Sequence, residues 1–151
     1  MNRSKRLQPV IQVAQLKARQ GLQAIAYMQK RLGEEQDKLA ALRACRDDYA
    51  SDNERENRTM NACFLKSFRE FSQSLEVALV QQSTQVGTVQ AQLHEVQGMW
   101  RKLDGRSRTL QKTQGRFAAE ERLLESKQEQ KYLDEFVSQQ AARAAAVRSH
   151  Q

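Results

Sequence analysis

The chain has 151 residues with one proline and six glycines, and alanine, leucine, glutamine, glutamate, lysine and arginine dominate it. Such a composition is not that of a compact globule; it favours long helices or a coiled coil. The net charge is +7; the first 33 residues hold seven lysines or arginines and no acid, whereas residues 34–76 hold seven bases and ten acids, so we expect two ends with different partners. The sequence contains neither an apolar run long enough to span a membrane nor a secretory signal, which predicts a cytoplasmic protein.

The first predicted helix covers about residues 8–50. Pro9 suits its first turn, where a missing N–H costs nothing. Apolar residues or glycines then recur at alternating steps of three and four, which is typical of a coiled-coil seam. The clearest of them are Ile11, Ala14, Ala18, Gly21, Ile25, Met28 and Leu32.

A turn is predicted at about residues 51–60, within the sequence SDNERENRTMNA. Its aspartate and asparagines offer the backbone hydrogen bonds that compete with those of a helix. The segment lacks glycine and proline, so the predicted break is a soft one.

The second predicted helix covers about residues 59–147, and its seam begins with Phe64, Phe68, Phe71 and Leu75. A short turn makes the two helices antiparallel and pairs positions whose numbers sum to about 114. This register pairs large side chains with small ones across the seam. The predicted pairs are Trp100 with Ala14, Val96 with Ala18, Leu93 with Gly21, and Val89 with Ile25.

The fold class that follows is all-α: one domain over residues 1–151, built as an antiparallel coiled-coil hairpin whose second helix extends well beyond the first. Residues 108–147 form an unpaired overhang that still carries apolar residues. Because a lone helix with an uncovered apolar stripe is marginal in water, the overhang predicts a partner.

No catalytic constellation is present. The chain has no phosphate-binding loop and only two histidines, His94 and His150, so we expect no enzyme, no cofactor and no metal site. Cys45 and Cys63 are expected to be reduced thiols at the edge of the seam.

A basic segment lies at the base of the overhang, with one acid, Asp104, inside it. Its bases are Arg101, Lys102, Arg106, Arg108, Lys112 and Arg116. They form either a solvated helical face or an electropositive collar that meets nucleic acid, anionic lipid or an acidic protein cavity. Nucleic acid is disfavoured, since no aromatic residues are interleaved with the bases.

Three stretches carry a family resemblance: Trp100 followed by RKLDGRSRTLQ, the stretch ESKQEQKYLDEFVSQQAARA near the end, and FREFSQSLEVAL. Together with the length and the unequal helices, they make the chain resemble FliJ, the soluble component of the flagellar type III export apparatus. The resemblance implies a two-helix coiled coil like that of the γ subunit of rotary ATPases.

The resemblance also implies a function at the cytoplasmic face of the inner membrane, with only indirect membrane contact. In that family the terminal end sits in the central hole of the hexameric, FliI-like export ATPase and promotes ring formation and ATP hydrolysis. The other end contacts the linker of the export-gate protein FlhA. Members also bind empty export chaperones.

The resemblance places the gate-binding site near the hairpin tip. Carried onto this chain, it falls on Leu42, Tyr49, Phe71, Leu75 and Ala78. This chain departs from the family's pattern at two positions. The family has an aromatic residue where this chain has Cys45, and a histidine where this chain has Gln82. We expect Phe71 and Leu75 to be partly exposed.

The predicted ATPase-ring site combines the collar and the overhang. It comprises Arg101, Lys102, Arg106, Arg108, Leu110, Lys112, Phe117, Leu124 and Phe136. Two alternatives stay open: a stalk protein of a virulence-type secretion system, and a structural coiled coil that dimerises through its overhang.

Overall fold

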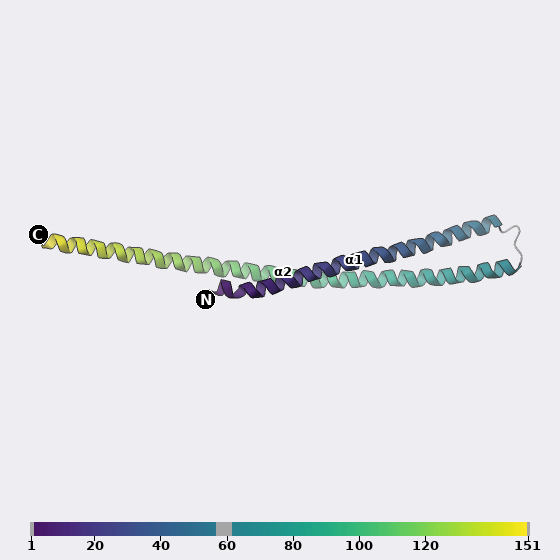
Figure 1. The fold of residues 1–151 in the computed structure, drawn as a ribbon, viewed down its shortest axis with the longest axis horizontal. Helices are drawn as coiled ribbons and strands as arrows, with labels where there is room; N and C mark the ends of the chain where they lie inside the picture. The colour runs from purple at the N-terminus through teal and green to yellow at the C-terminus, as the bar shows by residue number, and fades with distance from the viewer. Residues whose placement is uncertain (1, 57–61, 151) are drawn as a thin grey trace. The chain divides into compact units, whose positions relative to one another are not determined.

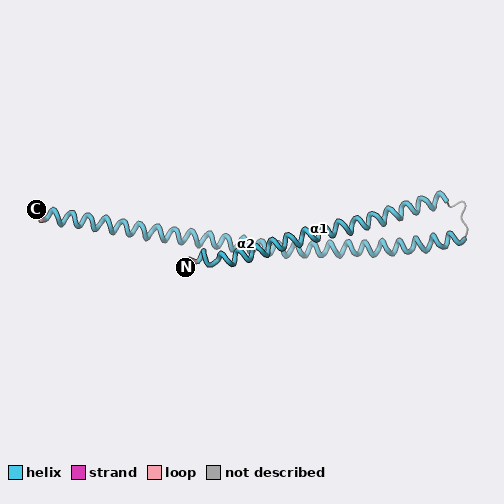
Figure 2. The backbone as a smooth tube through the Cα atoms, viewed as in Figure 1, coloured by secondary structure: helices cyan, strands magenta, loops and turns pink. Residues whose placement is uncertain are grey.

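The computed structural model describes residues 2–56 and 62–150. It contains two helices, α1 (Arg3–Glu56) and α2 (Ala62–Ser149), shown in Figure 1. The described backbone is helical almost throughout and contains no strand (Figure 2). The prediction of an all-α hairpin with a longer second helix is therefore confirmed.

α1 extends beyond the predicted range 8–50 at both ends. α1 begins at Arg3, so Pro9 lies inside the helix, and the Asn2 carbonyl accepts hydrogen bonds from the amides of Lys5 and Arg6 at 3.1 and 3.2 Å. At the other end α1 continues through the predicted turn as far as Glu56, because asparagine and aspartate disfavour helix only weakly. α2 is described from Ala62, and both its predicted start at residue 59 and the rest of the predicted turn lie outside the described residues.

Contacts between residues divide the chain into two units. One contains Met1–Leu16 and Asp104–Gln151, and the other is Lys17–Leu103. In each unit a piece of α1 packs against a piece of α2.

The core of the unit Lys17–Leu103 is a thin apolar seam. Leu39, Leu75, Leu79 and Val86 form one buried cluster, and Val89 is the most deeply buried side chain of the described residues. Burying a leucine of this kind stabilises the fold by roughly 1.5–3 kcal/mol. Because the seam has few such residues, each one matters more than in a globular core.

The register differs from the predicted one by seven residues at Trp100. The predicted partner of Trp100 was Ala14, and that of Gly21 was Leu93. Instead, Gly21 packs against Trp100, and a Cβ atom at Gly21 would lie 3.1 Å from Trp100 Cδ1. The principle that bulk faces a small residue holds, but the pairing is shifted because α1 continues further than predicted before the chain reverses.

Candidate functional site

An aromatic cluster marks the end of the unit Lys17–Leu103 that is nearest the connection between the helices. The Tyr49 ring stacks on Phe68 with centroids 4.8 Å apart and planes 7° apart. The ring centroid of Phe71, on α2, lies 4.4 Å from that of Tyr49, and the two ring planes are tilted by 42°. Contacts of this type contribute roughly 0.5–1.5 kcal/mol beyond area burial. Phe71 is nonetheless 42% exposed, so part of its ring is open to a partner.

The structure separates the predicted gate-binding residues by burial. Phe71 is exposed as expected, and Leu42, Tyr49 and Ala78 are half-buried. The expectation that Leu75 is partly exposed is wrong. Leu75 is only 8% exposed, because it belongs to the apolar cluster formed with Leu39 and Leu79. Leu75 therefore belongs to the core beneath the exposed Phe71 and is not part of the exposed surface.

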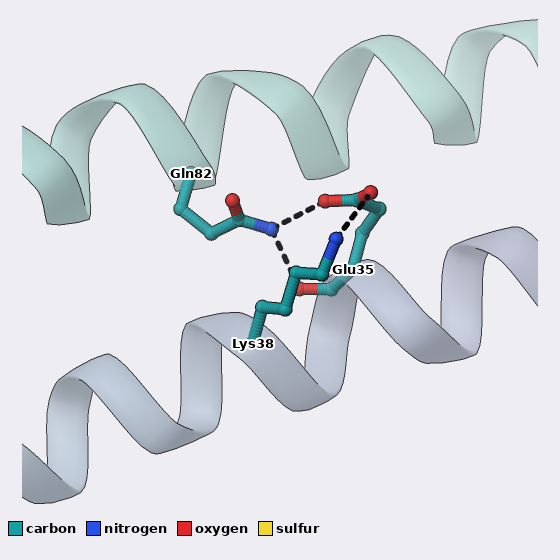
Figure 3. Close-up of polar contacts among 3 residues, drawn as sticks. All are labelled: Glu35, Lys38 and Gln82. Carbon is teal, nitrogen blue, oxygen red and sulfur yellow. Dashed lines mark hydrogen bonds and ion pairs between the residues drawn. The ribbon is translucent and has the colours of Figure 1, made fainter.

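A polar layer formed by Glu35 and Gln82 interrupts the seam next to the apolar cluster that contains Leu39 and Leu79. The Gln82 amide donates hydrogen bonds to the backbone carbonyl of Glu35 at 2.9 Å and to its carboxylate at 2.6 Å (Figure 3). Lys38 Nζ lies 3.4 Å from the same carboxylate. The hydrogen bond from Gln82 is the main cause that lowers the pKa of Glu35, and Lys38 adds to it. A polar pair at a seam position favours one register over its neighbours.

A second polar cluster lies in the unit formed by Met1–Leu16 and Asp104–Gln151. The Glu121 carboxylate accepts a hydrogen bond from the Ser4 amide at 3.1 Å and from the Ser4 hydroxyl at 2.6 Å. Ser4 is in the first turn of α1, whose amides have no partner within the helix. Glu121 of α2 therefore caps α1 from outside, and these hydrogen bonds lower the pKa of Glu121.

Two further contacts hold the start of α1 against α2. Gln114 Nε2 donates to the Ser4 carbonyl at 3.0 Å and to Gln8 Oε1 at 2.7 Å. The Arg3 guanidinium lies 5.7 Å from the centre of the Phe117 ring, within the range of a cation–π contact. These contacts explain how the first two turns of α1 remain helical although Pro9 interrupts the helical hydrogen-bond ladder.

The predicted overhang begins later than residue 108. Ser107 is buried, Leu110 and Phe117 are half-buried, and Glu121 is the last residue of α2 that is not exposed. The prediction that residues 108–121 are unpaired is wrong, because α1 starts earlier and pairs in a shifted register. The described residues from 122 onward are all exposed and form what we call the C-terminal segment, residues 122–149.

The C-terminal segment exposes many large apolar side chains. Phe136 is 50% exposed, Leu133 58% and Tyr132 70%. The other exposed apolar residues of this segment are Leu123, Leu124, Val137 and Val147. Leu133, Phe136 and Val137 follow one another at helical spacing and share one face of α2. Of the predicted ring-binding residues, only Leu124 and Phe136 lie in this segment.

The bases of the predicted collar are all exposed. Arg108 forms an ion pair with Asp104, with Nε and Oδ2 3.0 Å apart. Because Arg108 is exposed and only one helical turn from the half-buried Asp104, the pair contributes little to stability. In the unit Met1–Leu16 with Asp104–Gln151, two bases of α1 lie beside α2: Arg3 contacts Phe117, and Lys5 acts electrostatically on Glu121.

Sequence reasoning missed both polar clusters. Glu35, Gln82 and Glu121 occupy seam positions as polar exceptions in the apolar pattern, and the pattern did not indicate their partners. The available signal was the pairing itself: two polar residues at facing seam positions, and a carboxylate opposite the start of a helix. Reading that signal requires the correct register.

No site for chemistry appears in the part of the chain that the structure describes. His94 and His150 are exposed, and both cysteines are free and exposed. Within the described residues, neither helix has an apolar stretch that could cross a membrane.

The fold defines a helical-hairpin protein in which Phe71 and the described residues of the C-terminal segment are exposed. The family model described as the flagellar FliJ protein matches residues 3–146. The chain therefore belongs to the FliJ family, whose members are components of the flagellar export apparatus. Neither a curated protein nor a solved structure is significantly similar to the chain.

Proposed function

We propose that this chain is a non-catalytic stalk of flagellar protein export. Its C-terminal segment binds the hexameric, FliI-like export ATPase and promotes ring assembly and ATP hydrolysis. The aromatic end binds the linker of the FlhA-like export gate, and the chain also escorts empty export chaperones. The family match supports a role in flagellar protein export. The exposed surfaces support the assignment of the ATPase to the C-terminal segment and of the gate to the aromatic cluster.

The observation that carries the ATPase contact is the exposure of residues 122–149. Every described residue of this segment is exposed, although the segment includes Leu133, Phe136 and Val137. Most helical stability in proteins comes from packing of an apolar face, and the exposed apolar face of this segment favours association. A partner that covers this face stabilises the helix and gains the apolar burial.

Stimulation of the ATPase needs no catalytic group on the stalk. If the C-terminal segment binds the assembled ring more tightly than the separate subunits, mass action shifts the subunits toward the ring. Exposed bases such as Arg106, Lys112 and Arg116 add electrostatic attraction where the ring presents acidic groups.

The test is ATP hydrolysis by the purified export ATPase of the same organism, with the full chain and with a chain that ends after Glu121. The cut falls there because Glu121, which accepts hydrogen bonds from Ser4 of α1, is the last described residue of α2 that is not exposed. We expect the full chain to stimulate hydrolysis and the shortened chain to remain folded without stimulating it. Equal stimulation by both chains would refute the role of the C-terminal segment.

The gate contact is tested by Phe71→Ala and Leu75→Ala, with Val77→Ala as the control. Phe71 and Val77 are both exposed, whereas Leu75 is buried. Phe71→Ala should weaken binding to the cytoplasmic part of the gate protein with a loss of stability of about 1 kcal/mol or less. Leu75→Ala should cost about 2–4 kcal/mol of unfolding free energy. A Phe71→Ala chain that binds the gate like Val77→Ala would exclude Phe71 from the contact.

A further inference from the structure

The first turns of α1 carry an exposed face that none of the proposed contacts uses. Four residues recur there at steps of three and four, a spacing that places them on one side of the helix. They are Arg3, Arg6, Val10 and Val13. The Arg3 guanidinium lies over the Phe117 ring, so this side of α1 adjoins Phe117 of α2. We call the four residues of α1, together with Phe117, the N-terminal face.

The N-terminal face is apolar where the opposite side of the seam is polar. On the opposite side, a cavity of about 450 Å³ is lined by Ser4, Lys5 and Gln8 of α1 and by glutamines and small residues of α2. No large apolar side chain lines that cavity. On the N-terminal face, Val10 is 43% exposed and Val13 is 53% exposed. Valine is a poorer helix former than glutamine, so neither valine is explained by the stability of α1 alone.

The charge around the N-terminal face is positive. Where the two helices of this unit pair, over residues 2–16 and 104–121, α1 holds three bases and α2 holds four bases and three acids, which gives a net charge of +4. Two of these acids are already engaged, Asp104 by an ion pair within α2 and Glu121 by hydrogen bonds from the start of α1. The third, Glu120, is exposed on α2. The net charge therefore favours an acidic partner over a basic one.

Three other occupants fit this face less well. The phosphates of a nucleic acid would engage the bases but leave both valines exposed. A bilayer binds amphipathic helices more strongly the more apolar area they bury, and two valines bury little. A second copy of the chain would bring two positive units together, and like charges repel. A helix that is apolar on one side and acidic at its borders matches both features of the face.

We propose that the N-terminal face binds an amphipathic helix of another protein whose apolar side is bordered by acidic side chains. Its apolar residues would cover Val10 and Val13, and its carboxylates would lie toward Arg3 and Arg6. Arg6 is available, because it forms no ion pair with any residue that the structure describes. At 1.5 Å per residue the face is about 15 Å long, which is about three turns of a docked helix. This contact goes beyond the proposed function, which assigns none of these α1 residues to the ATPase or the gate.

The test measures the binding of two labelled helical peptides to the full chain by fluorescence anisotropy. Both peptides have three heptads with leucine at the a and d positions; one carries glutamate at e and g, and the other carries lysine. Val13→Asp is compared with Val77→Asp, because Val77 is a valine of similar exposure, 56%, on α2 in the other unit. Arg6→Gln is compared with Lys5→Gln, because Lys5 is the adjacent base but lines the cavity on the opposite side.

We expect the acidic peptide to bind the unmodified chain, Val77→Asp and Lys5→Gln equally. It should bind Val13→Asp at least about tenfold more weakly and Arg6→Gln about threefold more weakly. The lysine peptide should bind the unmodified chain far more weakly than the acidic one. The proposal is overturned if the acidic peptide fails to bind, if the lysine peptide binds equally well, or if Val13→Asp and Arg6→Gln bind like their controls.

Two further measurements address the other occupants. Sedimentation with vesicles of phosphatidylglycerol and phosphatidylcholine tests a membrane contact, and sedimentation of the chain alone tests a dimer. We expect Val13→Asp to change neither result. Vesicle binding that Val13→Asp abolishes would assign the face to a membrane, and a dimer that Val13→Asp converts into a monomer would assign it to a second copy. Either result would overturn the proposal.

Discussion

Glu121 caps the first turn of α1 by accepting hydrogen bonds from the amide and the hydroxyl of Ser4, at 3.1 and 2.6 Å. The two residues are 117 positions apart in the sequence, and their contact marks where the pairing of α1 with α2 ends. The exposed C-terminal segment begins at the next residue. The Glu121 carboxylate therefore provides a hydrogen-bond acceptor for the start of α1. It also marks where the surface that we assign to the ATPase begins.

Replacing Glu121 should loosen the start of α1 without unfolding the rest. In Glu121→Gln the amide can still accept one hydrogen bond, but the charge opposite the helix start is lost. We expect faster hydrogen exchange at the amides of residues 3–8 and unchanged exchange within Lys17–Leu103. Glu120→Gln, which alters an exposed neighbour, should leave all of these rates unchanged. Unaltered exchange in Glu121→Gln would show that the cap is dispensable.

The same contact predicts a pH dependence. Because the pKa of Glu121 is lowered in the folded chain, the contact stabilises the fold fully above the ordinary glutamate pKa. That contribution is lost as the pH falls through the lower, folded-state pKa. An NMR titration of the Glu121 carboxyl should show its pKa rising toward the ordinary value in Ser4→Ala. An unchanged titration would mean that Ser4 is not the cause of the shift.

The polar layer of Glu35 and Gln82 gives a prediction about register. Gln82→Ala should raise the pKa of Glu35, since the Gln82 hydrogen bond is the largest cause of its lowered value. Replacing both residues by leucine should raise the melting temperature, because an apolar layer avoids burying polar groups. It should also broaden the distribution of helix pairings, since the polar pair no longer disfavours shifted registers. Spin-label distances between α1 and α2 would measure this; a single sharp distance in the double variant would refute a role in register.

Gly21 and Gly33 form a matched pair within α1. Adding a Cβ atom at Gly21 would place it 3.1 Å from Trp100 Cδ1 and 3.3 Å from Trp100 Cβ, whereas nothing lies within 4 Å at Gly33. Gly33→Ala should therefore raise the unfolding free energy by about 0.5–1 kcal/mol through helix propensity alone. Gly21→Ala should lower it, because the indole cannot move aside without losing its packing. Thermal unfolding followed by circular dichroism decides the point, and equal gains from both changes would contradict the close packing.

Periodicity was enough to predict the fold class, because helix composition and seam spacing are properties of short windows of sequence. The burial of Ile11, Ala14 and Val89 follows from the same pattern. Periodicity could not predict the register, because the pairing depends on where the chain reverses. No glycine or proline in the sequence marks that point. The error then carried over to the surfaces: Leu75, Leu110 and Phe117 were assigned to partners although the structure packs them within the chain.

The polar contacts were lost for the same physical reason. A glutamate that caps a helix start looks like any exposed acid until its partner is known. Phe136 is exposed as predicted, because it lies beyond the part of α2 that pairs with α1, where exposure does not depend on register; its contact with the ring stays a prediction. Family membership supplied the process, which periodicity alone leaves open.

The most direct test of the account is hexamer assembly by the export ATPase in the presence of Leu133→Asp with Phe136→Asp. Both residues lie on the exposed apolar face of the C-terminal segment, so the changes should leave the hairpin folded. A chain with Ser138→Asp and Gln139→Asp adds the same charge to the same segment, away from the face formed by Leu133, Phe136 and Val137, and serves as the control. The account predicts that the control promotes hexamers in sedimentation like the unmodified chain and that the Leu133, Phe136 variant does not. Full hexamer formation with that variant would contradict the claim that this face holds the ATPase ring.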